Sequence, residues 1–170
     1  MGARLAAAGG TSVMRFWLID KIQTFEPGVA LTAVKNVTLT EEYLADHFPE
    51  FPVLPGVFML EAATQAGAWL LRLSDDFAYS IIRLREAKNI KYADFVPPGN
   101  TLAVAVSLVK KEDRLVTMKV EGQIGDRTTL SGRLVLEQYN LAERDAEQGV
   151  IDEQMKQYFR RAARVLLPGK

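Results

Sequence analysis

Cysteine is absent from this 170-residue chain, and histidine occurs once, at position 47. The first absence excludes disulfides, thiolate catalysis and cysteine-ligated zinc. With a single histidine as well, we do not expect a conventional transition-metal site within one chain. An excess of one charge is also lacking, since 21 Lys and Arg residues balance 21 Asp and Glu residues. No overall field therefore favours nucleic acid or a membrane surface, and any basic docking patch must be local.

Long apolar runs are lacking too. The longest candidate, residues 57–71, is interrupted by Glu61 and Gln65 and falls short of the roughly 20 apolar residues of a membrane-spanning helix. Residues 1–12 are mostly small, and their apolar run is too short for a signal-peptide core. We interpret them as a flexible tail, with a transit peptide as the less favoured alternative. The cytoplasm is the expected compartment.

The pattern of apolar residues predicts strands, then one long helix, then more strands. Proline and glycine at 27–28 and the VPPGN segment at 96–100 mark turns. Thr40, followed by two glutamates, is typical of a helix N-cap and predicts a short helix through Ala45. The expected strands are 15–22, 30–39, 79–92, 101–111, 114–124 and 128–139, the last three as an antiparallel meander. The expected helices are 55–73 and 142–167, the latter closing at Pro168 and Gly169.

The long helix decides the predicted architecture. Its apolar residues occur on every side, which is typical of a buried helix rather than an amphipathic one. A central buried helix flanked by strands predicts an α+β hot-dog fold, in which an antiparallel sheet wraps around the helix. We expect a flexible tail at 1–12, the hot-dog domain at 13–140 and an extra C-terminal helix within a 141–170 extension. Because one sheet covers only part of the helix, dimerisation through a sheet edge is the expected way to complete its burial.

Two ionisable residues, His47 and Glu61, interrupt the apolar middle of the chain. Desolvating an ionised carboxylate costs several kcal/mol, so a buried Glu61 needs a partner, and Thr64 and Gln65 lie one turn further along the helix. The alternative is a Glu61 side chain that reaches the surface. A lone His47 is most often a surface residue or one hydrogen-bonded into the core. It is also the best general base that this chain offers near neutral pH.

Three prolines, Pro49, Pro52 and Pro55, separate these two residues. Each proline fixes its own φ and biases the preceding residue away from helix, so the link is stiff. Pro55 fits the first turn of the long helix, where Gly56 and Val57 then offer free backbone N–H groups. Such groups at the positive end of a helix can polarise a carbonyl and stabilise an enolate-like oxyanion. A base, an acid and these donors suit proton removal next to a carbonyl with loss of a β-hydroxyl.

The segment from His47 to Ala66 and its flanking segments resemble a known family. HFPEFPVLPGVFMLEAATQA is similar to the HFPxxPxxPGVxxxEAxxQ signature of the FabZ-type (3R)-3-hydroxyacyl-acyl-carrier-protein dehydratases of bacterial fatty-acid synthesis. The run FWLIDKI to DHFP and the segment IKYADFVPPGNTL resemble the family's flanking segments, so similarity spans about residues 16–139.

The resemblance implies a hot-dog dimer, or a trimer of dimers, with catalytic His from one subunit and Glu from its neighbour. By that picture His47 takes the proton α to the thioester, and Glu61 protonates the departing hydroxyl or positions water. The Gly56 N–H holds the thioester oxygen, with Val57 as a less certain second donor. Three further residues are supporting: Pro49, Pro55 and Gln65. The implied partner is an acyl carrier protein whose phosphopantetheine bears the acyl chain, and no cofactor or metal is implied.

The chain departs from the family pattern at four places. Glu50 stands where the family usually has glycine, and Asn100 replaces the usual aspartate of the PGD turn. The family's HRYP element before the first strand is missing, and the C-terminal extension exceeds the usual length. These departures indicate a divergent or specialised member.

Two other functions stay open at this stage. One is a thioesterase on the same fold, and the other is a non-catalytic acyl-binding or assembly subunit, which retention of His47 and Glu61 disfavours. Because carrier proteins are acidic, a basic docking rim is expected. The candidates are Arg83, Arg85, Lys88 and Lys91, with Arg160, Arg161 and Arg164 as a second cluster; an ordinary solvated surface is the alternative for both. No nucleic-acid partner is expected.

Overall fold

The computed structural model describes residues 16–48 and 50–167. The expected tail, Pro49, Pro168 and Gly169 lie outside the described residues. Six strands form: β1 (Lys21–Glu26), β2 (Ala30–Asn36), β3 (Ile81–Tyr92), β4 (Thr101–Glu112), β5 (Leu115–Ile124) and β6 (Arg127–Tyr139). The helices are α1 (Tyr43–Asp46), α2 (Gly56–Ser74) and α3 (Gly149–Leu166), with 3-10 turns η1 (Leu141–Glu143) and η2 (Ala146–Gln148).

The strands form one antiparallel sheet in the order β1-β2-β4-β5-β6-β3. Gly28, with φ of 69°, lets the chain reverse between β1 and β2, and β4, β5 and β6 follow as the expected meander. β3 crosses over to pair with β6, with Ile81 opposite Tyr139 and Tyr92 opposite Leu130. β1 and β3 are therefore the two edges of the sheet in the described part of the chain.

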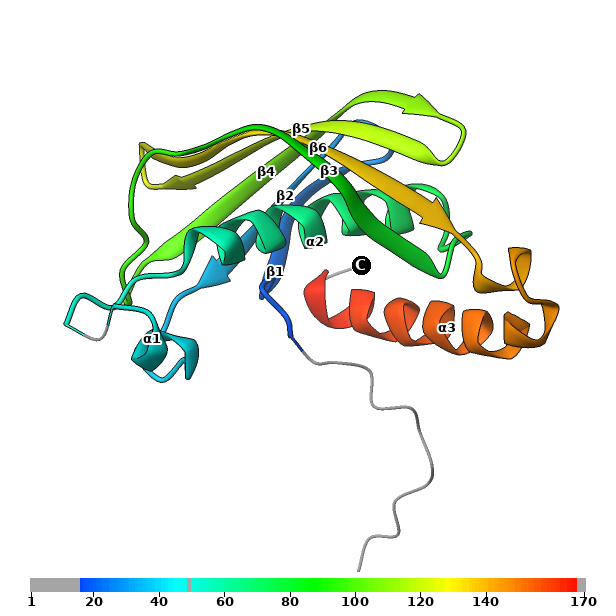
Figure 1. Ribbon diagram of the computed structural model, residues 1–170, viewed down its shortest axis with the longest axis horizontal. Helices are drawn as coiled ribbons and strands as arrows, with labels where there is room; N and C mark the ends of the chain where they lie inside the picture. The colour runs from blue at the N-terminus through cyan, green and yellow to red at the C-terminus, as the bar shows by residue number, and fades with distance from the viewer. Residues whose placement is uncertain (1–15, 49, 168–170) are drawn as a thin grey trace, which may run out of the picture.

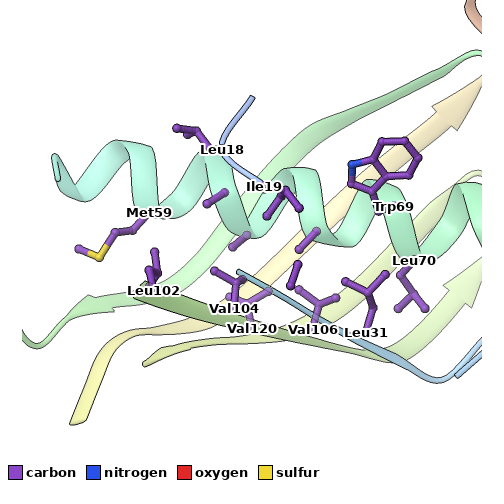
Figure 2. Packing of buried hydrophobic residues seen from close by; sticks show 14 of the residues in the cluster. Leu18, Ile19, Leu31, Met59, Trp69, Leu70, Leu102, Val104, Val106 and Val120 are labelled. Atoms are coloured by element: carbon purple, nitrogen blue, oxygen red, sulfur yellow. The ribbon is translucent and has the colours of Figure 1, made fainter. Parts of the chain in front are cut away.

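The sheet curves around α2, which lies in its concave face (Figure 1). Side chains of α2 such as Met59 and Leu70 belong to one buried apolar cluster with strand residues such as Leu102 and Val104 (Figure 2). The helix approaches the sheet closely at Gly67, where a Cβ would lie 2.9 Å from both Leu136 and Met118 side chains. A methyl group at this position would therefore force the Leu136 or Met118 side chain to shift.

Burial of α2 on every side, as expected, holds for most of its length but not for its start. Between Ala62 and Arg72 every residue except Gln65 is buried. Val57, in the first turn, is by contrast 63% exposed.

Three elements near the N-terminus differ from expectation. The first strand is Lys21–Glu26 rather than 15–22, and the second ends at Asn36 rather than at residue 39. Residues 16–19 are not a strand, although Leu18 and Ile19 are each only 1% exposed. Their apolar run predicts burial correctly, but the Leu18 N–H donates to Gln65 on α2 rather than to a neighbouring strand. The short helix begins at Tyr43 rather than after Thr40, because the Thr40 hydroxyl contacts Thr38 instead of capping the helix.

The C-terminal extension packs against the rest of the chain. Asn140 and Glu143 form a capping box around η1, so regular α-helix begins only at Gly149 rather than near 142. Asp152 on α3 is buried and accepts hydrogen bonds from the Ser80 hydroxyl and from the Leu141 and Ala142 N–H groups, the latter two at 2.8 Å. Within the described ranges, no helix combines the length and apolar character needed to cross a membrane.

Candidate active site

His47 ends the short helix α1 and lines a cavity at the start of α2. The backbone leaves helical geometry at His47, and Phe48 follows with φ of 50°, an uncommon conformation for a bulky residue. The His47 and Phe48 rings lie 4.4 Å apart. The cavity has a volume of about 430 Å³, and its other lining residues include Gly56, Tyr92, Asp94 and Phe95. We call it the His47 cavity.

The first turn of α2 contributes backbone donors to the same cavity. Pro55 is the N-cap, and its carbonyl accepts hydrogen bonds from the Phe58 N–H at 2.8 Å and the Met59 N–H at 3.2 Å. No acceptor among the described residues takes the N–H of Gly56 or Val57, as expected for the first turn of a helix. The helix dipole adds partial positive charge there, so this turn can hold a developing oxyanion.

Glycine at position 56 is set by a close contact with Tyr92. A Cβ on Gly56 would lie 3.2 Å from two carbons of the Tyr92 ring, tighter than ordinary packing allows. Tyr92 is the last residue of β3, and partial burial raises the pKa of its phenol. The ring therefore stays neutral and forms one wall of the His47 cavity.

Glu61 is held by Gln65, one turn further along α2. The Gln65 Nε2 donates to Glu61 Oε1 at 2.9 Å and to the Phe16 carbonyl at 3.0 Å. The Gln65 Oε1 in turn accepts from the Leu18 N–H at 2.9 Å. These three hydrogen bonds fix the Gln65 amide. The second carboxylate oxygen of Glu61 accepts no hydrogen bond from a described residue, so it can bind another group. Thr64, the other partner expected for Glu61, instead donates to the Leu60 carbonyl.

Glu61 does not share the His47 cavity. It lines a second cavity of about 220 Å³ together with Gln65, Arg72 and aromatic residues of α2 and α3, which we call the Glu61 cavity. The helical period explains the separation, because Glu61 follows Gly56 by five residues, which turns its side chain roughly 140° around the helix. One chain thus carries the proposed base with the backbone donors in one cavity and the proposed acid in another.

The four basic residues predicted to dock a carrier protein all lie on the edge strand β3, namely Arg83, Arg85, Lys88 and Lys91. Arg83 donates twice to one oxygen of Glu137, at 3.0 and 2.8 Å, and this hydrogen bonding lowers the pKa of the carboxyl. Lys88 pairs with Glu86 at 3.0 Å. Arg83 and Lys88 thus each have an acidic partner within the chain, and the docking role of the four residues stays a prediction.

Several residues of these cavities carry no signal that sequence reasoning could use. Tyr92 and Phe95 come to His47 from a distant strand and its following loop, and Tyr158 and Phe159 come to Glu61 from α3. In the sequence, Arg72 is typical of the cations found in the last turn of a helix, yet its side chain is buried and only 8% of the residue is exposed. No cluster of three or more His, Asp or Glu residues that could hold a metal occurs in the described part of the chain.

Residues 12–133 match the model of the FabA-like domain family. A FabZ 3-hydroxyacyl-[acyl-carrier-protein] dehydratase of Levilactobacillus brevis is 34% identical over 116 residues, which are 68% of this chain and 78% of that protein. The FabZ dehydratase of Clostridium kluyveri is 36% identical over 120 residues, 71% of this chain and 83% of the relative. This chain belongs to the FabZ family. The family resemblance predicted from the HFP-to-EA motif is therefore confirmed.

Solved structures of low sequence identity support the fold of this FabZ-family chain. The dehydratase heterocomplex ApeI:P from Xenorhabdus doucetiae matches with a TM-score of 0.63 at 17% identity, covering 78% of this chain and 90% of the matched one. A mutant thioesterase from Pseudomonas aeruginosa matches with a TM-score of 0.56 at 15% identity, covering 69% and 79%. The predicted hot-dog fold is confirmed, and because these neighbours include both dehydratases and a thioesterase, the fold alone does not assign the reaction.

Proposed function

We propose that this protein dehydrates (3R)-3-hydroxyacyl-acyl-carrier-protein to trans-2-enoyl-acyl-carrier-protein in fatty-acid biosynthesis. Its family membership supports this reaction class. The observation that carries the proposal is the His47 cavity, which is lined both by the only histidine of the chain and by Gly56, whose N–H begins α2. A base and an oxyanion site in one cavity are what removal of a proton next to a thioester carbonyl requires.

In the proposed mechanism, neutral His47 takes a proton from C2 of the acyl chain. The electron pair of that C–H bond moves to form the C2=C3 double bond, while negative charge builds on the thioester oxygen, where the Gly56 N–H stabilises it. The Val57 N–H is a second donor to this oxygen. The C3–O bond breaks as Glu61 protonates the hydroxyl, which leaves as water. A proton has then moved from substrate to His47 and another from Glu61 to water, and proton exchange with solvent resets both residues.

The acid in this mechanism comes from a second subunit. Within one chain Glu61 lies in a different cavity from His47, so a complete site requires Glu61 of the partner subunit. The edge strand β3 supports such a dimer, because its 12 residues pair on one side only within the described chain. Apolar side chains near the His47 cavity are also largely exposed, Phe51 at 55%, Val57 at 63% and Phe95 at 55%. A dimer interface would cover this surface.

The acyl carrier protein is the proposed partner, and the chemistry needs no metal or redox cofactor because both proton transfers use side chains. A homodimer, or a trimer of dimers, in the cytoplasm is the corresponding proposal for assembly and compartment. Arg85 and Lys91 are the better candidates for carrier docking, because neither forms a salt bridge with a described residue, whereas Arg83 and Lys88 have acidic partners.

An assay that separates two products tests the reaction. Purified protein is given a 3-hydroxyacyl thioester of acyl carrier protein, and enoyl formation and thiol release are measured in parallel. We expect enoyl thioester with no thiol release above the enzyme-free control. Thiol release without enoyl product would identify a thioesterase, and binding of the carrier without either product would identify a non-catalytic subunit.

A further inference from the structure

The Glu61 cavity extends from the proposed catalytic acid along α2 and beneath the C-terminal helix. Its walls are aromatic, and they come from three separate segments. Trp17 precedes β1, Trp69 belongs to α2, and Tyr158 and Phe159 belong to α3. Ring centroids lie 6.2 Å apart for Trp17 and Tyr158, and 5.8 Å apart for Trp69 and Phe159. The appended helix α3 therefore supplies part of this cavity and lies on the side of α2 away from the sheet (Figure 1).

Arg72 lines the same cavity and has no anionic partner. Its side chain is stacked on Phe159, with the guanidinium carbon 3.7 Å from the ring centroid, and no carboxylate or carbonyl of a described residue accepts a hydrogen bond from it. The Nε–H is fully covered and without an acceptor. Burial lowers the pKa of Arg72 to about 10, so the group remains charged near neutral pH. A buried cation without a counter-ion is costly, and stacking on an aromatic face offsets only part of that cost.

Arg72 and Glu61 lie on the same face of α2. Arg72 follows Glu61 by 11 residues, about three helical turns, so the two side chains project from the same face of α2, with Cα atoms roughly 16 Å apart along the axis. Among the residues that line the cavity, Glu61 is the one acid. An acyl chain whose C3 hydroxyl meets Glu61 would continue from there along apolar and aromatic walls toward Arg72.

We propose that the Glu61 cavity receives the far end of an acyl chain that carries a terminal carboxylate, and that Arg72 is the residue that binds this carboxylate. This proposal rests on the proposed dehydratase function, since it takes Glu61 as the point at which the acyl chain enters. With its face stacked on Phe159 and its Nε–H covered, the guanidinium has its terminal N–H groups as the donors for a carboxylate in the cavity. Arg72 is thus a specificity-determining residue, and α3 supplies the wall that holds it in place.

Calorimetric titration tests this binding without relying on turnover. The probes are two saturated acyl-pantetheine thioesters of equal chain length, one ending in a carboxylate and one in a methyl group, compared over a series of lengths. For the length that spans the cavity, we expect the wild-type protein to bind the carboxylate-ended probe roughly tenfold to a hundredfold more tightly, since a hydrogen-bonded charged group is involved. Arg72→Met should abolish this preference, and Arg72→Lys should retain part of it.

Arg161→Met is the matched control, because Arg161 is an exposed α3 residue that donates only to the Gln157 carbonyl at 3.4 Å. This variant should keep the wild-type preference. Equal affinity of the wild-type protein for the two probes at every length would overturn the proposal, even if Arg72→Met failed to fold. A preference that survives Arg72→Met would overturn the role of Arg72. Dehydration of methyl-ended 3-hydroxyacyl substrates, measured separately, decides whether the proposed function itself holds.

Discussion

The His47 cavity and the Glu61 cavity are built differently, although the same helix contributes to both. The first combines backbone N–H groups, a histidine and exposed aromatic side chains such as Phe48 and Phe95, and it lies between the start of α2 and the end of β3. The second is walled by aromatic residues from α2, α3 and the segment before β1, with Glu61 fixed by Gln65. The contrast shows that His47 and Glu61 line different cavities of one chain, and in the proposed mechanism each cavity is therefore a half-site that a second copy completes.

Removing the ionisable group of either half-site should have the largest effect. We expect His47→Ala and Glu61→Gln each to lower kcat by roughly 10²–10⁴-fold, the usual contribution of a general acid or base. Neither side chain belongs to the buried core, so thermal unfolding should change little. Turnover is measured as enoyl formation. Wild-type turnover in either variant would contradict the roles assigned to these residues.

The His47 half-site should be the more sensitive to a small change in shape. In Gly56→Ala the new methyl group would press on the Tyr92 ring, 3.2 Å away, and displace the backbone donor or the cavity wall. A displacement on the order of 1 Å lowers turnover by up to about a hundredfold, so we expect a loss of roughly tenfold to a hundredfold in kcat/KM. Gly149→Ala is the control, since its Cβ would meet only Ala142, at 3.9 Å. Equal activity of the two variants would remove the constraint on Gly56.

The Glu61 half-site should depend on Gln65 as a positioning residue. Gln65→Leu removes the hydrogen bonds that join Glu61, Phe16 and Leu18, so we expect kcat to fall about tenfold. KM should change less, because in the proposed mechanism Gln65 acts through the position of Glu61. Gln123→Leu is the matched control, since Gln123 also donates to a neighbouring glutamate, Glu121, but lines neither cavity. A rise in KM at unchanged kcat would instead indicate a binding role.

The smallest effect on catalysis, but a measurable one on stability, should come from the anchor of α3. Burial raises the pKa of Asp152, but hydrogen bonds from Ser80, Ala142 and Leu141 outweigh it, so its pKa in the folded protein lies below the ordinary value. The stability contributed by this ionised carboxyl is therefore present above about pH 3.9, the unfolded value, and is lost as the pH falls through the lower folded pKa.

Asp152→Asn should unfold at lower denaturant concentration than the wild type at pH 7, and the difference should shrink as the pH is lowered through this window. Asp126→Asn, in the exposed turn between β5 and β6, should show no such difference. Urea unfolding at several pH values measures both. A difference that stays constant with pH would show that ionisation of Asp152 does not matter.

Much of the fold follows from the sequence because local signals and burial agree there. The meander of β4, β5 and β6 and the bounds of α2 follow from alternation, turn residues and Pro55. Local patterns fail where tertiary contacts decide, as at residues 16–19, whose apolar run is buried without becoming a strand because Leu18 bonds Gln65. The same limit applies to the cavities. The motif names His47, Gly56 and Glu61. Their division between two cavities depends on the angle between Gly56 and Glu61 around α2 and on the loop that carries His47 from α1.

Subunit complementation tests the central claim most directly. Equal amounts of the His47→Ala and Glu61→Gln proteins are unfolded together, refolded and assayed for enoyl formation, with each variant refolded alone as the control. If the site is shared between subunits, each mixed dimer contains one site with both His47 and Glu61 intact, so activity should return well above that of either variant alone. If mixed dimers form and activity stays at the level of the single variants, the site lies within one chain and the account is wrong.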